Sequence, residues 1–308
     1  MPFNSPLLAA AAPYLFVLLW STGFIAAKFG LPHAEPMAFL AYRFLILVPL
    51  TALICVLARA VWPREARVYG HLVVAGLLLH GVYLGGVFAA IREGLGAGVV
   101  ALIVGGQPLL TVLLARLWLR ERVAMRQWLG LGLGLMGVYG VLADRVALGL
   151  GAATGLPWAI AALVGISFGT LYQKKHCGGV ELPVSTFVQY SACALLFTIC
   201  APLVGSLAAQ WTPAFIGALF WLVVVLSLGA IGLLYFLLRT GAAAEVARFF
   251  YLVPAVTAVL AFLLFDETLG LGAMLGMAAI AAGVVLARPA APASQAPLPG
   301  KATQGVRG

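Results

Sequence analysis

The sequence predicts an all-α membrane protein in which ten transmembrane helices form two five-helix repeats. Composition is the first reason: 64% of the 308 residues are hydrophobic, 9% are charged, and the mean hydropathy is +1.10. Soluble domains are about half apolar and a quarter charged. The charges also lie in short clusters between long apolar runs, and not at helical spacing along them. We therefore exclude soluble domains, which need polar outer faces.

An internal duplication is the second reason. Pro108 and Glu121 recur as Pro254 and Glu267, 146 residues later, and further pairs share this offset or one of 147. A fixed offset across different residue types indicates a repeated unit, and we expect repeats at 7–142 and 154–288. The further pairs are Gly130 and Gly276, Gly137 and Gly283, Ser21 and Ser167, Gly23 and Gly169, Lys28 and Lys174, Pro36 and Pro183, Arg92 and Arg239, and Gly94 and Gly241.

The lengths of the apolar runs place the helices. A helix needs about 20 apolar residues to cross the hydrocarbon core, and the chain supplies ten such runs. Pro36, Pro183 and Pro213 mark helix starts, where a missing N–H costs nothing, while Gly94 and Gly241 mark helix ends. The runs cover 7–30, 36–58, 67–91, 95–119, 123–142, 154–175, 183–204, 211–238, 243–265 and 269–287.

Basic residues predict the orientation. With residues 1–6 in the cytoplasm, fourteen Lys and Arg lie on the inner side and three on the outer side, as the positive-inside rule requires. Both termini are then cytoplasmic, 143–153 is a periplasmic connection, and the composition of 289–308 predicts a disordered tail. Because each repeat has an odd number of helices, the two insert in opposite orientations, as in many secondary transporters.

These features resemble one known family. The Trp20-Ser21-Thr22-Gly23 start, Arg43 in the second helix, the doubled proline, glutamate and glycine pattern and the ten-helix duplication are similar, over residues 7–288, to the EamA-type branch of the drug/metabolite transporter superfamily. Within it, the chain looks most like the YddG-like bacterial amino-acid and metabolite exporters. The resemblance implies a basket of eight helices around a central cavity, with the fifth and tenth helices at the periphery.

Arg43 is the first candidate for substrate binding. It lies seven residues past Pro36, about 10 Å into the second helix at 1.5 Å per residue. A charge at that depth indicates a functional site, and a guanidinium there would recognise a substrate carboxylate. The alternative is a structural arginine that snorkels outward or pairs with Glu35 or Glu93. Its repeat counterpart is Tyr190, so the predicted site is charged at one end only.

The third, fourth and ninth helices add further candidates. His80, with Tyr83 one turn on, either binds substrate and titrates near neutral pH or is a satisfied packing group. Gln107 precedes Pro108, and a proline inside a helix, here Pro108 or Pro254, frees a backbone carbonyl. The prolines are hinges for gating or tolerated kinks, which membrane helices often contain.

The first and sixth helices supply the remaining candidates for the lining of the cavity. Trp20 would either stack on an apolar substrate group or anchor the helix at the membrane interface. Ser21, Thr22 and Ser167 would bind substrate or hydrogen-bond neighbouring helices.

Charged residues at helix ends suggest gates. Arg92 with Glu93 outside, and Glu245 with Arg248 inside, would pair when one side closes. Ion pairs near helix ends are, however, common and weak.

Other residues have structural interpretations. Glu121 and Glu267 are expected to cap the helix that follows each of them, and Lys28 to snorkel at a helix end. The glycine-rich fifth and tenth helices permit close packing or form a dimer face, so the chain is a monomer or a homodimer.

The sequence predicts no catalytic residue, cofactor or metal site. All nine acids lie at helix ends or in loops, the four cysteines have no metal-binding spacing, and nucleotide-binding loops and nucleophile elbows are absent. Because topology accounts for the basic residues, we expect no nucleic-acid partner. The expected partners are a small-molecule substrate and the lipid bilayer.

Export of amino acids, including aromatic or other neutral ones, and of related metabolites is the predicted function. We expect alternating access across a bacterial inner membrane, without obligatory coupling. The alternatives are a carrier of anionic metabolites such as sugar phosphates, for which more buried Lys and Arg are expected, and a multidrug exporter. An intramembrane enzyme or a receptor is the alternative from another class.

Overall fold

The computed structural model describes residues 6–119, 124–147, 152–230, 233, 252–267 and 270–286, which are almost entirely helical. The first repeat contributes α1 (Pro6–Gly30), α2 (Pro36–Leu57), α3 (Ala66–Gly76), η1 (Leu77–Val82), α4 (Tyr83–Arg92), α5 (Ala97–Gly105), α6 (Gln107–Leu119) and α7 (Met125–Ala147). The second contributes α8 (Ala152–His176), α9 (Leu182–Val204), α10 (Pro213–Phe220), η2 (Trp221–Ala230), α13 (Val253–Phe265) and α14 (Leu271–Leu286).

Six helices of the described ranges are long and apolar enough to cross a membrane, which confirms the helical membrane class. The number ten stays a prediction, because the expected runs 211–238 and 243–265 extend beyond the described residues. The six spans are Ala11–Gly30, Pro36–Leu57, Ala66–Arg92, Thr154–His176, Leu182–Val204 and Pro213–Ala230, and shorter apolar helices are Ala97–Thr111, Val253–Phe265 and Met274–Gly283.

Several helix boundaries follow the local signals in the sequence. α2 begins at Pro36 and α10 at Pro213, where the Thr212 hydroxyl accepts a hydrogen bond from the backbone N–H of Phe215. α4 ends at Arg92, and Gly94 has a φ of +91°, a conformation that favours glycine. These predicted starts and this predicted stop are confirmed, whereas Gly241 lies outside the described residues.

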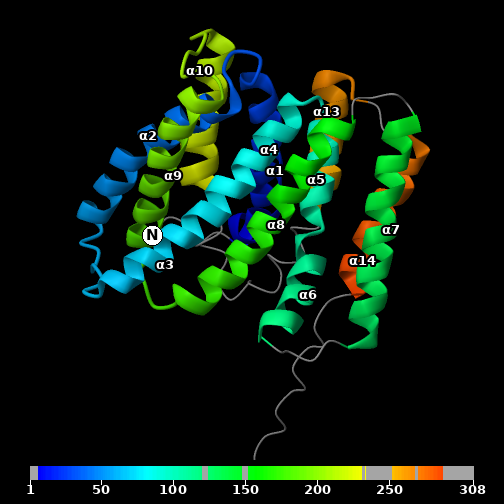
Figure 1. Cartoon of the computed structure of the whole chain (residues 1–308), viewed down its shortest axis with the longest axis horizontal. Coiled ribbons are helices and arrows are strands. Elements are labelled where there is room, and N and C mark those ends of the chain that lie inside the picture. The colour runs from blue at the N-terminus through cyan, green and yellow to red at the C-terminus, as the bar shows by residue number, and fades with distance from the viewer. Residues whose placement is uncertain are drawn as a thin grey trace, which may run out of the picture.

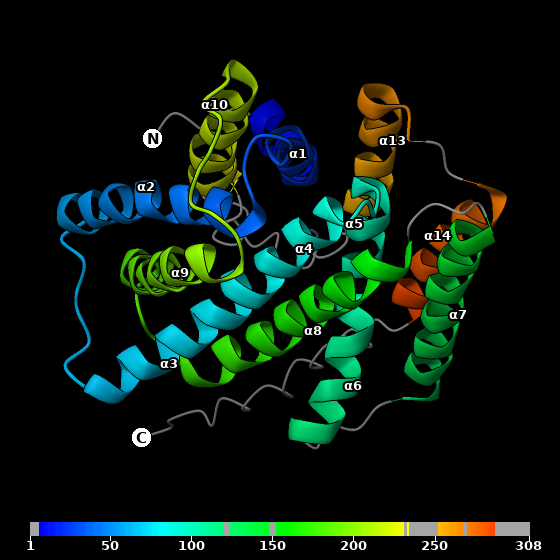
Figure 2. The same ribbon diagram turned by 45° about the horizontal axis from the view of Figure 1, so that its top comes forward.

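The main helix pairs each join one repeat to the other. α2 packs along α9, α4 along α8, α5 against α13, and α7 along α14 (Figures 1 and 2). The bulk of the core therefore lies between the repeats. Its largest fully buried side chains are aromatic: Phe16, Phe39, Phe44, Phe88, Phe197 and Phe215.

The α7–α14 pair stands at one edge of the bundle (Figure 1), as the family resemblance implies for the fifth and tenth helices. A Cβ added to Gly137 would lie 2.5 Å from the carbonyl oxygen of Gly276, and one added to Gly283 would lie 2.5 Å from that of Gly130. No side chain fits in so little space, so glycine permits the two helices to touch. These glycines hold one repeat against the other inside the chain.

Two segments widen into π-helix at equivalent places in the repeats. η1 continues α3 into α4, and η2 continues α10. π-helical segments are rare and occur frequently at functional sites.

The prolines expected to kink the fourth and ninth helices lie in first turns, which corrects the prediction of mid-helix positions. α5 stops at Gly105, and α6 restarts at Gln107 with Pro108 in its first turn. Pro254 likewise lies in the first turn of α13. The missing N–H of proline leaves no bond unmade there, because the first N–H groups of a helix have no partner within it.

Candidate functional site

Arg43 is buried between the repeats. Its side chain on α2 is 5% exposed, and its Nη2 donates a hydrogen bond of 2.9 Å to the hydroxyl of Ser227 on η2. Ser227 donates in turn to the carbonyl of Leu222, also at 2.9 Å. The Nε of Arg43 is buried without a hydrogen-bond partner among the described residues. The guanidinium thus neither snorkels nor pairs with Glu35, whose carboxylate binds Arg92.

Aromatic side chains and hydroxyls surround this cation. Tyr83 and Tyr190 lie within electrostatic range of Arg43 and are 8% and 2% exposed. The ring of His80 meets that of Tyr190 edge-on at 5.0 Å, and Phe44 lies 5.3 Å from the same tyrosine ring. We call Arg43, His80, Tyr83, Tyr190 and Ser227 the Arg43 cluster.

A polar and an aromatic layer extend the cluster along α9. The Nε2 of Gln189 donates to the hydroxyl of Ser185 at 2.9 Å and to the Oε1 of Gln173 at 3.2 Å. On the other side, Phe44 stacks on Phe197 with ring centroids 5.8 Å apart. A bound molecule would therefore meet both hydrogen-bonding and apolar surfaces beside the cation.

The cluster consists largely of repeat-related pairs. Arg43 on α2 corresponds to Tyr190 on α9, and His80 in η1 corresponds to Ser227 in η2, both at an offset of 147. The structure thus brings together four residues that the sequence singled out and adds Ser227, which the sequence analysis missed. The signal that identifies Ser227 is its offset from His80.

The candidates of α1 border η2 and α13. Trp20 packs on Phe16 with ring centroids 5.4 Å apart. The hydroxyl of Thr22 accepts a hydrogen bond of 2.8 Å from Nε1 of Trp221. Ser21 donates to the carbonyl of Val253 at 3.3 Å as well as to that of Val17 in its own helix at 2.8 Å.

Gln107 and Ser167 belong to α6 and α8. The Nε2 of Gln107 donates to the hydroxyl of Thr170 at 3.0 Å, and Ser167 donates to the carbonyl of Leu163 at 2.7 Å. Both hydrogen bonds are made within or between α6 and α8, and neither involves the Arg43 cluster.

Glu267 joins three helices at one end of the bundle. Its carboxylate pairs with Lys28 of α1 and accepts hydrogen bonds from the backbone N–H groups of Ala97, at 3.1 Å, and Gly98, at 3.4 Å. Lys28 also lies 4.3 Å from the ring centroid of Phe265. We call these contacts the Glu267 latch.

The latch corrects one expectation. Among the described residues, Glu267 caps α5 of the opposite repeat and not α14, while Lys28 lies in the last turn of α1 and forms an ion pair there. A carboxylate is stabilised at the positive end of any helix dipole, and the fold brings the end of α13 to the start of α5.

Arg92, a predicted outer gate residue, has an acid partner other than Glu93 in this structure. Arg92 binds Glu35 at 2.7 Å and donates to the carbonyl of Leu31 at 3.2 Å. Arg92 and Glu93 are consecutive in the chain, and consecutive side chains at a helix end do not face each other. Glu245 and Arg248 lie outside the described residues, as does Glu121.

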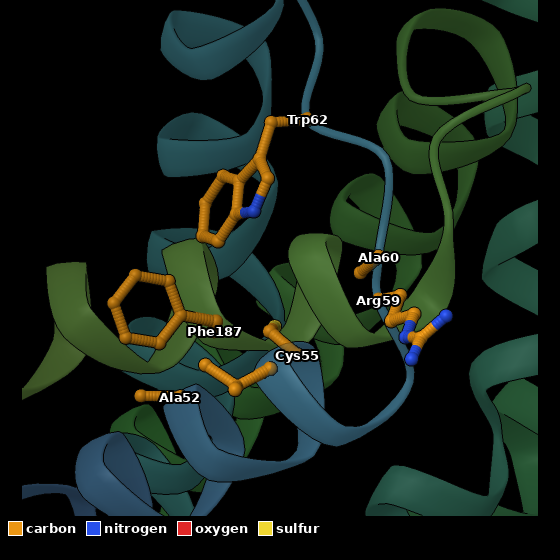
Figure 3. A pocket seen from close by; sticks show the side chains of 7 residues that line it. Ala52, Cys55, Arg59, Ala60, Trp62 and Phe187 are labelled. Atoms are coloured by element: carbon orange, nitrogen blue, oxygen red, sulfur yellow. The ribbon is translucent and has the colours of Figure 1, made fainter.

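Two pockets lie away from the Arg43 cluster. One of about 330 Å³, shown in Figure 3, is lined by Cys55 at the end of α2, by Arg59 just beyond that helix, and by Trp62 and Phe187. The rings of Trp62 and Phe187 meet edge-on at 5.6 Å. The other, of about 300 Å³, is apolar and includes Pro254. Four members of the Arg43 cluster, Arg43, Tyr83, Tyr190 and Ser227, are each less than a tenth exposed, and His80 is half-buried.

Comparison with known proteins places this geometry in a family. The model of the EamA-like transporter family matches residues 7–143 and, a second time, residues 153–288. The chain belongs to the EamA-like transporter family. The Arg43 cluster of this EamA-like protein therefore lies between the two family domains of a transmembrane transporter.

Several relatives extend over nearly the whole chain. The uncharacterized transporter YvbV of Bacillus subtilis is 28% identical, covering 88% of this chain and 88% of its own length. The uncharacterized inner membrane transporter YedA of Escherichia coli is 25% identical, covering 93% and 92%. A probable amino-acid metabolite efflux pump of Escherichia coli is 28% identical, covering 88% and 92%.

A crystal structure shares the fold. It superposes with a TM-score of 0.58 at 22% sequence identity, and the match covers 92% of this chain and 97% of that one.

Proposed function

We propose that this EamA-like protein exports amino acids, including aromatic and other neutral ones, and related small metabolites. It does so across a bacterial inner membrane, by alternating access between two inverted repeats, with both termini in the cytoplasm. The printed names of two relatives support this proposal: one is an inner membrane transporter, and another is a probable amino-acid metabolite efflux pump.

The observation that carries the proposal is the buried Arg43. Burying a charge without a counter-charge is costly, and a guanidinium recognises a carboxylate with two parallel hydrogen bonds. Arg43 has a buried Nε free of a described partner, and its Nη2 is held by a neutral hydroxyl that a carboxylate can replace. A carboxylate-bearing substrate would therefore supply the missing charge.

Counterflow in liposomes tests the proposal. Purified full-length protein is reconstituted with a high internal concentration of unlabelled phenylalanine or leucine, and a trace of the labelled amino acid is added outside at equal pH. We expect label to accumulate without any ion gradient. If vesicles that contain folded protein accumulate neither amino acid, amino-acid transport by an uncoupled route is refuted.

A pair of variants tests the site. Arg43→Gln should reduce counterflow at least tenfold, because it removes the charge that binds the carboxylate. Arg64→Gln is the matched control, since Arg64 is exposed between α2 and α3, and it should transport normally. Normal transport by folded Arg43→Gln would show that Arg43 has a structural role only.

A further inference from the structure

The charge of the Arg43 cluster narrows the substrate class beyond amino acids in general. We propose that the cluster selects small monocarboxylates of net charge −1 in which a neutral group, such as an acylated amine, replaces the free ammonium. The inference rests on the proposed function, because it concerns the same site.

The described neighbours of the buried cation are hydroxyl groups, the His80 imidazole and the ring of Phe44, whose centroid lies 5.9 Å from Cζ of Arg43. Nη2 of Arg43 binds the Ser227 hydroxyl at 2.9 Å, and the neutral phenols of Tyr83 and Tyr190 lie near the cation. These groups carry no charge, and no carboxylate of the described residues compensates the guanidinium. A ligand of net charge −1 neutralises the site on binding, and in a low-dielectric interior this favours it strongly.

A free amino acid, which is a zwitterion, is expected to bind the Arg43 guanidinium less well than a monoanion does. Its ammonium lies on the carbon next to the carboxylate, so a carboxylate seated on Arg43 brings the ammonium within a few ångströms of the guanidinium. The total charge of the occupied site then remains +1. Acylation of the amine removes this repulsion and leaves an amide, which phenol and amide side chains can hydrogen-bond without any counter-charge.

The asymmetry of the repeats argues against a dianion. The repeat counterpart of Arg43 is Tyr190, so of these two equivalent buried positions one holds an arginine and the other a phenol. A single guanidinium matches one carboxylate and leaves a phosphate dianion with an unpaired charge. Rings beside the cation, including Phe44 and Phe197 stacked at 5.8 Å, suit an apolar body on the substrate.

The test is competition against counterflow at pH 7 with ligands that share one ring and differ in charge. Phenylalanine, N-acetylphenylalanine, N-acetylphenylalaninamide and phenethylamine each compete with labelled phenylalanine and, separately, with labelled N-acetylphenylalanine. We expect N-acetylphenylalanine to compete at a concentration at least tenfold lower than phenylalanine does. The neutral amide, which has nearly the same size, and the amine should compete more weakly still.

Two further measurements fix the meaning of each outcome. Arg43→Gln should bring N-acetylphenylalanine and its amide within about twofold of each other, and thermal stabilisation of the detergent-solubilised protein by each ligand should follow the same order. If phenylalanine competes as well as or better than its N-acetyl derivative, the inference fails and amino-acid export stands. If neither labelled compound is exchanged and neither stabilises folded protein, both proposals fail.

Discussion

At the edge of the bundle, equivalent glycines of α7 and α14 make the same contact. A Cβ added to Gly137 would lie 2.5 Å from the carbonyl oxygen of Gly276, and one added to Gly283 would lie 2.5 Å from that of Gly130. At the centre, equivalent residues make different contacts. Ser21 of α1 reaches the carbonyl of Val253, whereas its counterpart Ser167 of α8 bonds only within its own helix among the described residues. Equivalent residues of α7 and α14 therefore make the same contacts, whereas equivalent residues of α1 and α8 make different ones.

The two lysines extend the comparison. Lys28 is held in the Glu267 latch, while its counterpart Lys174 is exposed and the counterpart of Glu267, Glu121, lies outside the described residues. Alternating access requires one repeat to close its end while the other opens the opposite end. Two different environments for one duplicated motif agree with the proposed alternating access, in which the α7–α14 pair would be a fixed support.

The largest expected effect concerns the symmetric edge. Gly137→Leu should destabilise the protein by about 1–3 kcal/mol or prevent folding, because the side chain overlaps the backbone of α14. Gly132→Leu on the same helix is the control, since a Cβ at Gly132 has open space around it. Thermal unfolding in detergent, followed by intrinsic fluorescence, measures both. Equal melting temperatures for the two variants would contradict the packing of α7 on α14.

The latch should give the next largest effect. Glu267→Gln removes the charge that pairs with Lys28 and weakens the cap on α5, so we expect a loss of about 1–2 kcal/mol. Lys28→Gln should cost less, about 0.5–1 kcal/mol, because Lys28 is partly exposed. Unfolding curves in detergent report both losses.

Lys174→Gln is the control for the latch. Because Lys174 is exposed, the melting temperature of Lys174→Gln should equal that of the unsubstituted protein. A loss equal to that of Lys28→Gln would mean that the two repeats are latched alike, and the asymmetry would disappear.

The smallest expected effect separates the two serines. Ser21→Ala removes a hydrogen bond between helices, which is worth about 0.6 kcal/mol in membrane proteins. Ser167→Ala removes a bond within one helix and should change stability by only a few tenths of that amount. Paired unfolding measurements under one detergent condition resolve the difference. The reverse order would show that α8, and not α1, is the more tightly joined helix.

The candidate site was partly predictable. Arg43 drew attention by its depth in an apolar helix, and Tyr190 by the repeat offset. His80 and Tyr83 followed from their place in the third helix, but no local feature distinguished Ser227 from other serines. Gln107 and Trp20 were predicted in the same lining, yet they contact Thr170 and Phe16. A polar residue deep in an apolar helix can be recognised from the sequence as a candidate site residue, but the residues that it contacts cannot.

The sequence by itself determined the membrane class, the duplication and several helix ends such as Pro36 and Gly94, because hydropathy, proline and glycine act through the local backbone and its solvent. Only the tertiary structure decided which partners meet. Arg43 and Ser227 are 184 residues apart, and Glu267 caps a helix that begins 170 residues earlier. Such contacts depend on which helices of opposite repeats lie side by side, and the pattern along one helix does not specify its neighbour.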